Sequence, residues 1–350
     1  MEVSLKGKRI ALVGGAGFIG HHLALEYKRL GAEVAVIDGL SVNNLLAFST
    51  TESRQPNSEL YMQIVHERLK LLKAHQIPVY VQDARDYHGL GEVINHKFKA
   101  NVIVHLAAVA HAGKSNKDPY STFDHSLRTL ENALDCARDM VDQFVYFSSS
   151  MVYGHFEGGA VTEETACNPL GIYGALKFGG EKLVIAYNQV FDLPYTIVRP
   201  SALYGERCVS RRVGQIFIEN ALQGLDIKVN GDGSDMLDFT YIGDLVNGMV
   251  QVVSQPGAKN QIFNLTYGKG RSIAEMVSIL TEHFPSVRVE YLPKDKLMPD
   301  RGTLSVDKAR KLIGYEPEFP LERGFVNYIN WYKGLFKDFG GSGNLSVLFG

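Results

Sequence analysis

The stretch GGAGFIG at residues 14–20 decides the fold, and it directly follows the apolar run RIALV at residues 9–13. Such a run is typical of a buried strand, and the glycines let the backbone turn tightly behind it. They also let a pyrophosphate approach the backbone and let the next helix begin with its amides facing the phosphate. Taken alone, the motif also fits a flexible turn, so the surrounding pattern has to decide between the two.

Short apolar runs alternate with helical patterns through the first half of the chain. The predicted strands are residues 9–13, 33–37, 79–82, 102–106, 144–148 and 195–198. The predicted helices are residues 18–30, 90–97, 122–140 and 173–190. Such alternation is the signature of βαβ units. We therefore predict an α/β fold with a doubly wound parallel sheet of the Rossmann type, covered by helices on both faces.

The predicted domains follow from where this alternation changes. Residues 1–200 are expected to form the Rossmann domain, with an inserted helix at about 58–75 that is either a packing insertion or a substrate lid. After Pro200 the elements become shorter, which predicts a smaller, partly interleaved α/β substrate lobe over residues 201–337. Residues 338–350, Gly/Ser-rich in part, are expected to be a flexible tail, a linker or a remnant of an expression vector.

Composition narrows the class of protein. The 350 residues carry 36 Lys plus Arg against 38 Asp plus Glu, a net charge of −2, so we expect no nucleic-acid partner. We see no signal peptide and no run long enough for a membrane span. The three cysteines are widely separated, which fits a reducing cytoplasm and offers no disulfide framework. We predict no metal site.

Asp38 ends the second predicted strand and indicates which dinucleotide binds. A carboxylate there can accept hydrogen bonds from the adenosine ribose hydroxyls and repels a 2′-phosphate, so NAD is favoured over NADP. The alternative is a turn residue before Gly39. Asp83 follows the third strand, where it can reach the adenine, and the small residues of HLAA at 105–108 leave room for the cofactor. Both features also fit strand-end capping and close packing.

Tyr173 and Lys177 lie one turn apart on the same face of a predicted helix. The usual pKa of a tyrosine, about 10, is too high for a base near neutrality. A neighbouring ammonium favours the phenolate, and Lys177 can also bind the nicotinamide ribose. The run Ser148-Ser149-Ser150 ends the fifth predicted strand, at the rim where the glycine loop also lies. A serine there can bind the substrate hydroxyl, although capping of the strand end accounts for one or two of the three.

In this order, GGAGFIG, Asp38, HLAA, SSSMVYG (148–154) and YGALK (173–177) resemble the extended short-chain dehydrogenase/reductase family. Within it, the chain is similar to the nucleotide-sugar epimerases and dehydratases, of which UDP-galactose 4-epimerases are the best known. The resemblance implies that Ser149, Tyr173 and Lys177 are catalytic, with Ser149 and Tyr173 also contacting substrate. The cofactor contacts it implies, together with the glycine motif, are Gly14, Gly17, Phe18, Ile19, Gly20, Asp38, Asp83, Ala84, Leu106, Ala107, Ala108, Tyr173 and Lys177. It also implies a homodimer formed through the helix of Tyr173 and its neighbour.

The chain departs from this family at three positions. His125 and Ala202 stand where an asparagine is common, and Leu237 stands where an arginine usually meets the diphosphate of the substrate. Guanidinium groups elsewhere can supply that charge, and otherwise they are surface residues. The candidates for binding the nucleotide-diphosphate sugar are Arg207, Arg211, Arg212 and Arg301.

The residues after Ser149 suggest the reaction. Dehydratases and decarboxylases of the family usually carry a carboxylate at the positions of Ser150 and Met151, and this chain has none there. We therefore expect an NAD-dependent isomerase that epimerises a nucleotide sugar, most simply at C4, through a transient keto-sugar. The alternatives are a decarboxylase, a dehydratase or a dehydrogenase of the same family, and a protein that senses NAD without catalysis.

Overall fold

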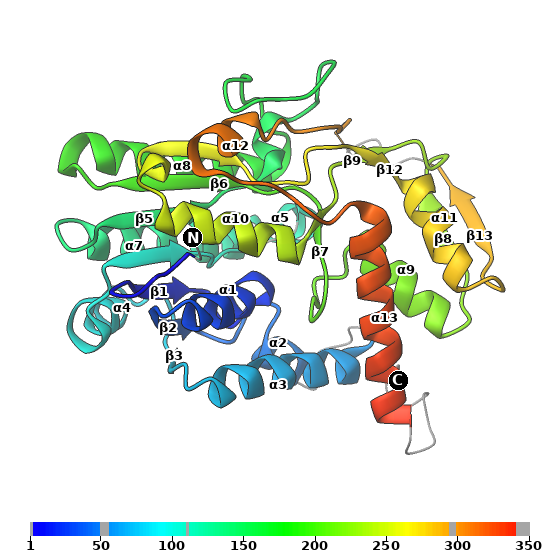
Figure 1. Ribbon diagram of the computed structural model, residues 1–350, viewed down its shortest axis with the longest axis horizontal. Helices are drawn as coiled ribbons and strands as arrows, with labels where there is room; N and C mark the ends of the chain where they lie inside the picture. Colours follow the sequence, from blue (N-terminus) through cyan, green and yellow to red (C-terminus); the bar gives the residue numbers. More distant parts are fainter. Residues whose placement is uncertain (1–2, 50–55, 110–111, 294–298, 341–350) are drawn as a thin grey trace.

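The computed structural model describes residues 3–49, 56–109, 112–293 and 299–340. Its centre is a parallel seven-stranded sheet with the strand order β11-β6-β5-β4-β1-β2-β3 (Figure 1). The strands are β1 (Arg9–Val13), β2 (Glu33–Asp38), β3 (Val79–Val81), β4 (Val102–His105), β5 (Gln143–Phe147), β6 (Tyr195–Arg199) and β11 (Gln261–Asn264). The order reverses between β1 and β4, so a crevice opens at the carboxyl ends of these two strands. The predicted Rossmann-type sheet is confirmed.

Alternate residues of each strand point to opposite faces of the sheet and pack into two separate hydrophobic cores. In β1, Ile10 and Leu12 belong to one core, whereas Ala11 and Val13 belong to the other. The first core is covered by α1 (Phe18–Arg29), α3 (Ser58–Ala74) and α10 (Ile242–Ser254). The second is covered by α4 (Tyr87–Gly91), η1 (Glu92–Phe98), α7 (Thr129–Ala137) and α8 (Gly171–Phe191). Both faces of the sheet are thus buried, which explains why its strands are almost wholly apolar.

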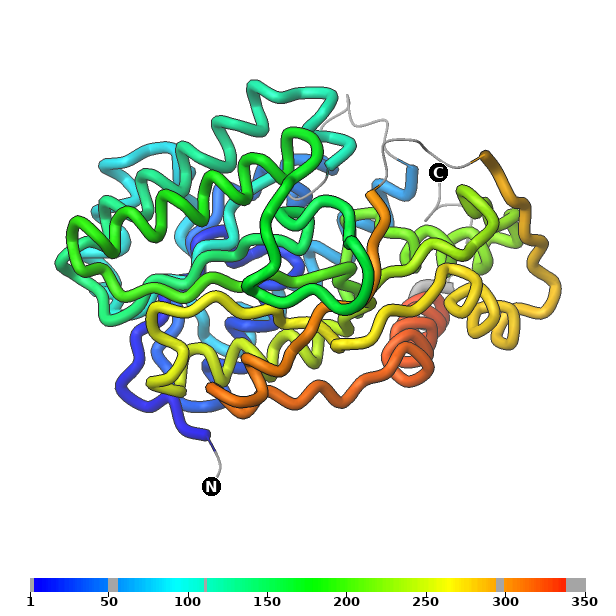
Figure 2. Tube along the Cα trace, turned by 90° about the horizontal axis from the view of Figure 1, so that it is seen from above, coloured from blue at the N-terminus to red at the C-terminus, as the bar shows by residue number. Residues whose placement is uncertain are grey.

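Part of the chain beyond residue 200 belongs to the central sheet and its helical layers, and the rest forms smaller elements beside them. β11 pairs with β6, and α10 packs against α1, so these segments belong to the same body as the nucleotide-binding half. The remaining elements are β7 (Leu203–Tyr204), α9 (Val213–Leu222), β8 (Ile227–Asn230), β9 (Met236–Leu237), β10 (Thr240–Tyr241), η4 (Pro256–Ala258), β12 (Arg271–Ser272), α11 (Ile273–His283), β13 (Val289–Leu292), α12 (Asp307–Ile313) and α13 (Leu321–Gly340). Their strands form three two-stranded ribbons, and the segments that carry α9, β8, α11 and β13 lie together at one end of the molecule, at the right of Figures 1 and 2.

The inserted helix α3 joins the two parts of the molecule. The buried carboxylate of Glu219 on α9 accepts hydrogen bonds from the hydroxyls of Tyr61 on α3 (2.7 Å) and Tyr332 on α13 (2.8 Å). In Figure 1, α13 accordingly runs beside α9 and across the end of α3. The apolar face of α3, with Leu60, Ile64 and Leu72 buried, packs into the same core as α1 and α10.

Other helical segments are shorter or less regular than expected. They are α2 (Leu45–Ser49), α5 (Ala112–Lys117), α6 (Pro119–Phe123), η2 (Asp124–Arg128) and η3 (Ser150–Tyr153). The predicted helix at 122–140 is divided among α6, the π-helical η2 and α7, and η1 is also π-helical. Wide π turns of this kind often occur near functional sites. α13 extends to Gly340, three residues into the tail expected from 338, and residues 341–350 lie outside the described part.

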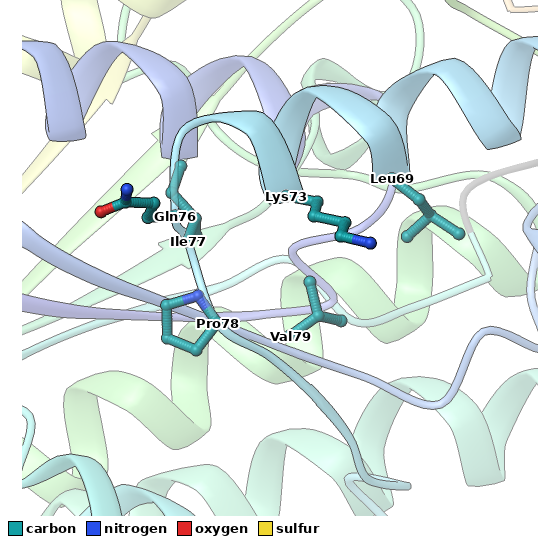
Figure 3. Close-up of a pocket in the computed structure, with 6 residues that line it drawn as sticks. All are labelled: Leu69, Lys73, Gln76, Ile77, Pro78 and Val79. Atoms are coloured by element: carbon teal, nitrogen blue, oxygen red, sulfur yellow. The ribbon is translucent and has the colours of Figure 1, made fainter.

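A surface hollow of about 490 Å³ lies beside the edge strand β3 (Figure 3). It is lined by Leu69, Lys73, Gln76, Ile77, Pro78 and Val79. Because Pro78 and Val79 lie where β3 begins, the hollow is at the opposite end of the sheet from the carboxyl edge. Among the described residues, no helix combines the length and the apolar character needed to cross a membrane.

Candidate active site

The glycine loop closes against the end of β4. Gly14 has a positive φ of 81°, and a Cβ on it would lie 2.6 Å from the backbone nitrogen of Ala107. A side chain at Gly14 would therefore clash with the neighbouring strand end as well as strain the turn. The contact brings Gly14 and Ala107 to the point where the strand order reverses, which is where ligands bind in sheets of this kind.

α1 begins directly behind this loop. Gly17 is its N-cap, and Phe18 and Ile19 form its first turn together with Gly20. A Cβ on Gly20 would lie 2.5 Å from the backbone of Gly15, so only glycine lets the helix sit this close to the loop. No acidic side chain occupies the first turn, so the helix N-terminus is free to face a phosphate.

Asp38 ends β2 beside the loop. Its carboxylate accepts hydrogen bonds from the amides of Ala16 (2.9 Å) and Leu40 (2.8 Å). Burial raises the pKa of Asp38, and these two amides oppose that rise. Each carboxylate oxygen has a further lone pair that can accept a ribose hydroxyl. The arrangement therefore suits NAD and leaves little tolerance for an additional phosphate.

The other expected cofactor residues line the same edge. Asp83 lies against Gly39 after β3, and Arg85 binds its carboxylate (2.6 Å) and lowers its pKa. Ala84 is buried, and Leu106 and Ala108 follow β4 with partly exposed side chains. Arg85 donates to both carboxylate oxygens of Asp83, from its backbone amide (2.9 Å) and from its guanidinium (2.6 to 3.1 Å), so an adenine amino group would have to share these oxygens with Arg85.

α8 places Tyr173 and Lys177 at the end of β5. A Cβ on Gly174 would lie 2.9 Å from the carbonyl oxygen of Met151, so α8 approaches η3 as closely as a glycine permits. Lys177 is buried, donates to the carbonyl of Phe147 (2.7 Å) and lies over the ring of Tyr146. Tyr173 is half-buried one turn away.

The charge of Lys177 is balanced by its surroundings. Burial lowers the pKa of Lys177 to about 8, and Glu181, one turn further along α8, opposes this. Glu181 is itself buried and forms an ion pair with Arg199 (2.7 Å). Lys177 thus remains mostly protonated at neutral pH, which is the state that favours a neighbouring phenolate.

The three serines at the end of β5 have three different environments. Ser148 donates to Glu181 (2.5 Å), and Ser149 caps η3 by accepting from the amide of Met151 (3.2 Å). Ser150 accepts from the guanidinium of Arg301. Ser149 and Ser150 only accept in these contacts, so each keeps its hydroxyl proton. Ser150 is fully buried and held by a charged guanidinium, whereas Ser149 is the more exposed of the two, at 8% against 1%. It is therefore the serine best placed to bind a substrate oxygen.

Arg301 and Arg212 lie together at this end of the sheet. Arg301 also donates to Ser201 (3.3 Å) and contacts the sulfur of Met151. Burial lowers the pKa of Arg301 to about 10, Arg212 lowers it further, and Tyr173 opposes the change. Its Nε is enclosed without a hydrogen-bond partner among the described residues. The charge of Arg212 and the hydroxyl of Tyr173 are thus close enough to Arg301 to affect its pKa, and two guanidinium groups in one region suit a multiply charged anion.

Arg207 and Arg211 point elsewhere in the structure. Arg207 donates to His21 on α1 (2.9 Å) and pairs with Glu67 on α3 (3.2 Å). Arg211 donates to the hydroxyl of Tyr61 on α3 (3.2 Å). Both arginines are thus engaged with the helices of the nucleotide-binding half, so of the four candidates only Arg212 and Arg301 are drawn together near Tyr173.

The three positions that depart from the family pattern have different structural environments. Ala202 adopts a left-handed backbone with φ of 38°, a conformation that asparagine tolerates better than alanine. Leu237 lies in β9 and pairs with Arg271 of β12. His125 lies in η2. Burial lowers the pKa of His125, and the charges of Arg85 and Asp83 lie close enough to affect it as well. Sequence reasoning overlooked Glu181 and His21, although Glu181 follows Lys177 by one turn and His21 follows the glycine motif directly.

These residues fit NAD on structural grounds: a Cβ would fill the glycine cradle, the Asp38 carboxylate lies beside it at the end of β2, and the buried amine of Lys177 lies at the end of β5. Among the described residues, no group of three or more His, Cys, Asp or Glu side chains could hold a metal ion. The chemistry that this arrangement supports is proton abstraction by Tyr173 from an oxygen held near Ser149, beside a phosphate-binding pair of arginines.

Comparison with known proteins agrees with this geometry. Residues 10–266 match the NAD dependent epimerase/dehydratase family. The chain is 29% identical over 336 residues to the "Uncharacterized UDP-glucose epimerase YtcB" of Bacillus subtilis, covering 94% of this chain and 99% of the relative. It is 28% identical to UDP-glucuronic acid decarboxylase 1 of Danio rerio, covering 93% of this chain and 73% of that protein.

A solved structure shares the fold over nearly the whole length. UDP-glucuronic acid 4-epimerase from Bacillus cereus, in complex with UDP-glucuronic acid and NAD, superposes with a TM-score of 0.82. The two chains are 24% identical, and the match covers 93% of this chain and 99% of the other.

Proposed function

The chain belongs to the NAD-dependent epimerase/dehydratase family, and on that premise we propose that it epimerises a nucleotide-diphosphate sugar at C4. The reaction proceeds through transient oxidation of the sugar to a 4-keto form. The cofactor is NAD, in agreement with the family and with Asp38 at the ribose position. The proposal concerns which of the family's reactions this chain catalyses.

The first half of the reaction needs a base and an orienting donor. Tyr173 takes the proton of the C4 hydroxyl, and Lys177 and Arg301 hold positive charge near the phenolate that does so. Ser149 donates to the same oxygen as it becomes a carbonyl. NAD⁺, when bound, supplies the chemistry of accepting the hydride from C4 and later returning it.

The second half needs no further residue. The keto-sugar turns over within the site and presents its other face, and Tyr173 returns the proton to the C4 oxygen as the C–H bond forms again. Atoms and electrons balance without a net change in the cofactor. Ala202, a small side chain at this edge, leaves room for that rotation.

The position of Arg301 is the single observation that favours epimerisation. Loss of water or carbon dioxide by relatives of this family requires an acid or base beside the serine, at Ser150 and Met151. In this structure both side chains contact the guanidinium of Arg301. Even with its pKa lowered to about 10, Arg301 stays protonated at neutral pH and cannot act as a base. The proton transfers of a lyase, typically worth about 10² to 10⁴ in rate, then have no catalyst.

Arg212 and Arg301 supply the positive charge for the diphosphate in the absence of an arginine at Leu237. Guanidinium groups bind phosphate oxygens with two parallel hydrogen bonds, which suits a diphosphate bridging two of them. Several relatives are named for UDP-sugars, so UDP-sugars are the first substrates to test. The decarboxylase relative is the reason to keep UDP-glucuronic acid decarboxylation as the second candidate.

The test is turnover by the purified protein with UDP-, GDP-, CDP- and dTDP-sugars, followed by mass spectrometry and chromatography of the products. The proposal predicts a product of unchanged mass and altered configuration. A loss of 44 mass units would replace it with a decarboxylase, and a loss of 18 with a dehydratase. Absence of turnover with any nucleotide sugar, despite tight NAD binding, would favour the non-catalytic sensor.

We also propose a cytoplasmic homodimer that pairs α8 and its neighbours across a two-fold axis. α8 carries an exposed apolar stripe of Ile172, Leu183 and Val190, and Tyr120 of α6 adds an 87% exposed ring beside it. Exposed apolar surface of this kind is usually covered by a partner. Sedimentation should give a dimer for the native chain and a monomer for Leu183→Glu. Dimers that persist in that variant would place the interface elsewhere.

A further inference from the structure

Arg207 occupies an unusual position between the cofactor loop and the chain that leads to the substrate. Its side chain is 18% exposed and its backbone has a left-handed φ of 62°, which is strained for a residue other than glycine. Such strain persists only where several contacts hold the residue in place. Here the carbonyl oxygen of Arg207 accepts from the buried guanidinium of Arg68 on α3, with an Nε distance of 3.0 Å.

The side chain of Arg207 reaches the cofactor loop through His21. The Nε of Arg207 lies 2.9 Å from Nε2 of His21, and Nδ1 of His21 lies 2.9 Å from the carbonyl oxygen of Gly17. Because Arg207 can only donate and Gly17 can only accept, His21 is neutral with its proton on Nδ1. Burial, aided by His22, Arg68 and Arg207, lowers the pKa of His21 well below its usual value.

Gly17 is the N-cap of α1 and part of the loop that cradles the pyrophosphate. Five residues beyond Arg207, the same segment ends at Arg212, which lies beside Arg301 and begins α9. One continuous set of hydrogen bonds therefore runs from the cofactor loop, through His21, to the segment that carries a candidate phosphate-binding arginine.

We propose that Arg207 and His21 act as a pair of positioning residues that lock the cofactor loop to the segment 205–212 and so slow the release of the dinucleotide. Retention matters for the proposed function, because a cofactor that returns its hydride must stay bound through both half-reactions. The inference rests on the proposed function only for the reason that the cofactor needs to be retained. The release of the dinucleotide is measured without a nucleotide sugar, so a failure of this inference can be told from a failure of the proposed function.

The experiment measures release of NADH from the loaded full-length protein. Excess NAD⁺ is added, and the fall in NADH fluorescence gives the dissociation rate. Arg207→Gln and His21→Leu should each raise this rate about 10-fold or more, as expected for loss of one charge-assisted hydrogen bond. The double variant should release NADH no faster than the faster single variant, because the two side chains form one link.

Two further variants separate positioning from general loosening. His21→Gln keeps one donor and one acceptor on a side chain of similar reach, so it should restore a rate within a few-fold of native. Tyr332→Phe removes the hydrogen bond between α13 and Glu219 on α9 and touches neither Gly17 nor the segment 205–212, so it should lower the melting temperature and leave the rate unchanged. The proposal is overturned if Arg207→Gln and His21→Leu release NADH at the native rate, if their effects add fully in the double variant, or if Tyr332→Phe accelerates release equally.

Discussion

Replacing Arg301 with methionine should leave the stability of the ligand-free protein nearly unchanged and impair the enzyme. The substitution keeps the length of the side chain and removes the guanidinium. In the native protein, burial lowers the pKa of Arg301 from 12.5 to about 10, so the fold disfavours the charged form by about 3 kcal/mol. The depressed pKa means that this cost is present at every pH below about 10, and the substitution removes it.

Two contacts offset that gain. Arg301 donates to the hydroxyls of Ser150 and Ser201, and each hydrogen bond from a charged group contributes about 1.5 kcal/mol. The gain and the loss nearly cancel, so the melting temperature should stay within about 2 to 4 °C of the native value. Loss of one charge-assisted contact to the diphosphate should meanwhile raise KM by about 10- to 100-fold.

The assay pairs thermal unfolding without nucleotide sugar with steady-state kinetics. Arg310→Met is the matched control, because Arg310 is an exposed arginine that forms ion pairs with Asp307 and Glu316 at the surface, and both readouts should stay at native values. A clear drop in the melting temperature of Arg301→Met, together with an unchanged KM, would refute the view that Arg301 is a buried charge held for the substrate.

Three other predictions concern the cofactor and the base. Asp38→Ala should weaken NAD⁺ binding and narrow its advantage over NADP⁺, as measured by calorimetry, and equal affinities in the native protein would contradict the role given to Asp38. Tyr173→Phe should preserve folding and NAD binding and lower turnover by orders of magnitude, so near-native rates would exclude it as the base. Glu181→Gln removes the charge that raises the pKa of Lys177, so that pKa should fall below about 8 and the alkaline limb of kcat/KM should move to lower pH. An unmoved limb would show that Lys177 does not govern it.

The sequence predicted a parallel sheet because the succession of strands and helices along the chain follows from local signals. GGAGFIG after RIALV marks a strand, a turn and a helix, and every later apolar run repeats the same unit. β11 escaped notice because QIFN is a short run, with η4 before it and the Gly-rich turn of residues 267–270 after it. Nothing in four residues distinguishes an edge strand of the main sheet from a strand of a two-stranded ribbon, and only the pairing of β11 with β6 does so.

The sequence predicted which site residues lie together only where those residues are close to each other along the chain. Tyr173 and Lys177 share a helix, so their spacing predicts their common face. Arg301 and Ser150 are separated by 151 positions, and Arg207 and His21 by 186. Such contacts depend on how the segments after residue 200 fold back over the sheet. Composition therefore predicted four candidate arginines, and the tertiary structure alone distinguishes the two near Tyr173.

The most direct test of the central claim follows a hydride through one turnover. A nucleotide sugar accepted by the protein is prepared with deuterium at C4, and the product is analysed by mass spectrometry and NMR while absorbance at 340 nm reports NADH. The account predicts a C4 epimer of unchanged mass that retains the deuterium at C4, with no accumulation of NADH. Loss of the label to solvent, a product lighter by 18 or 44 mass units, or steady formation of NADH would contradict it.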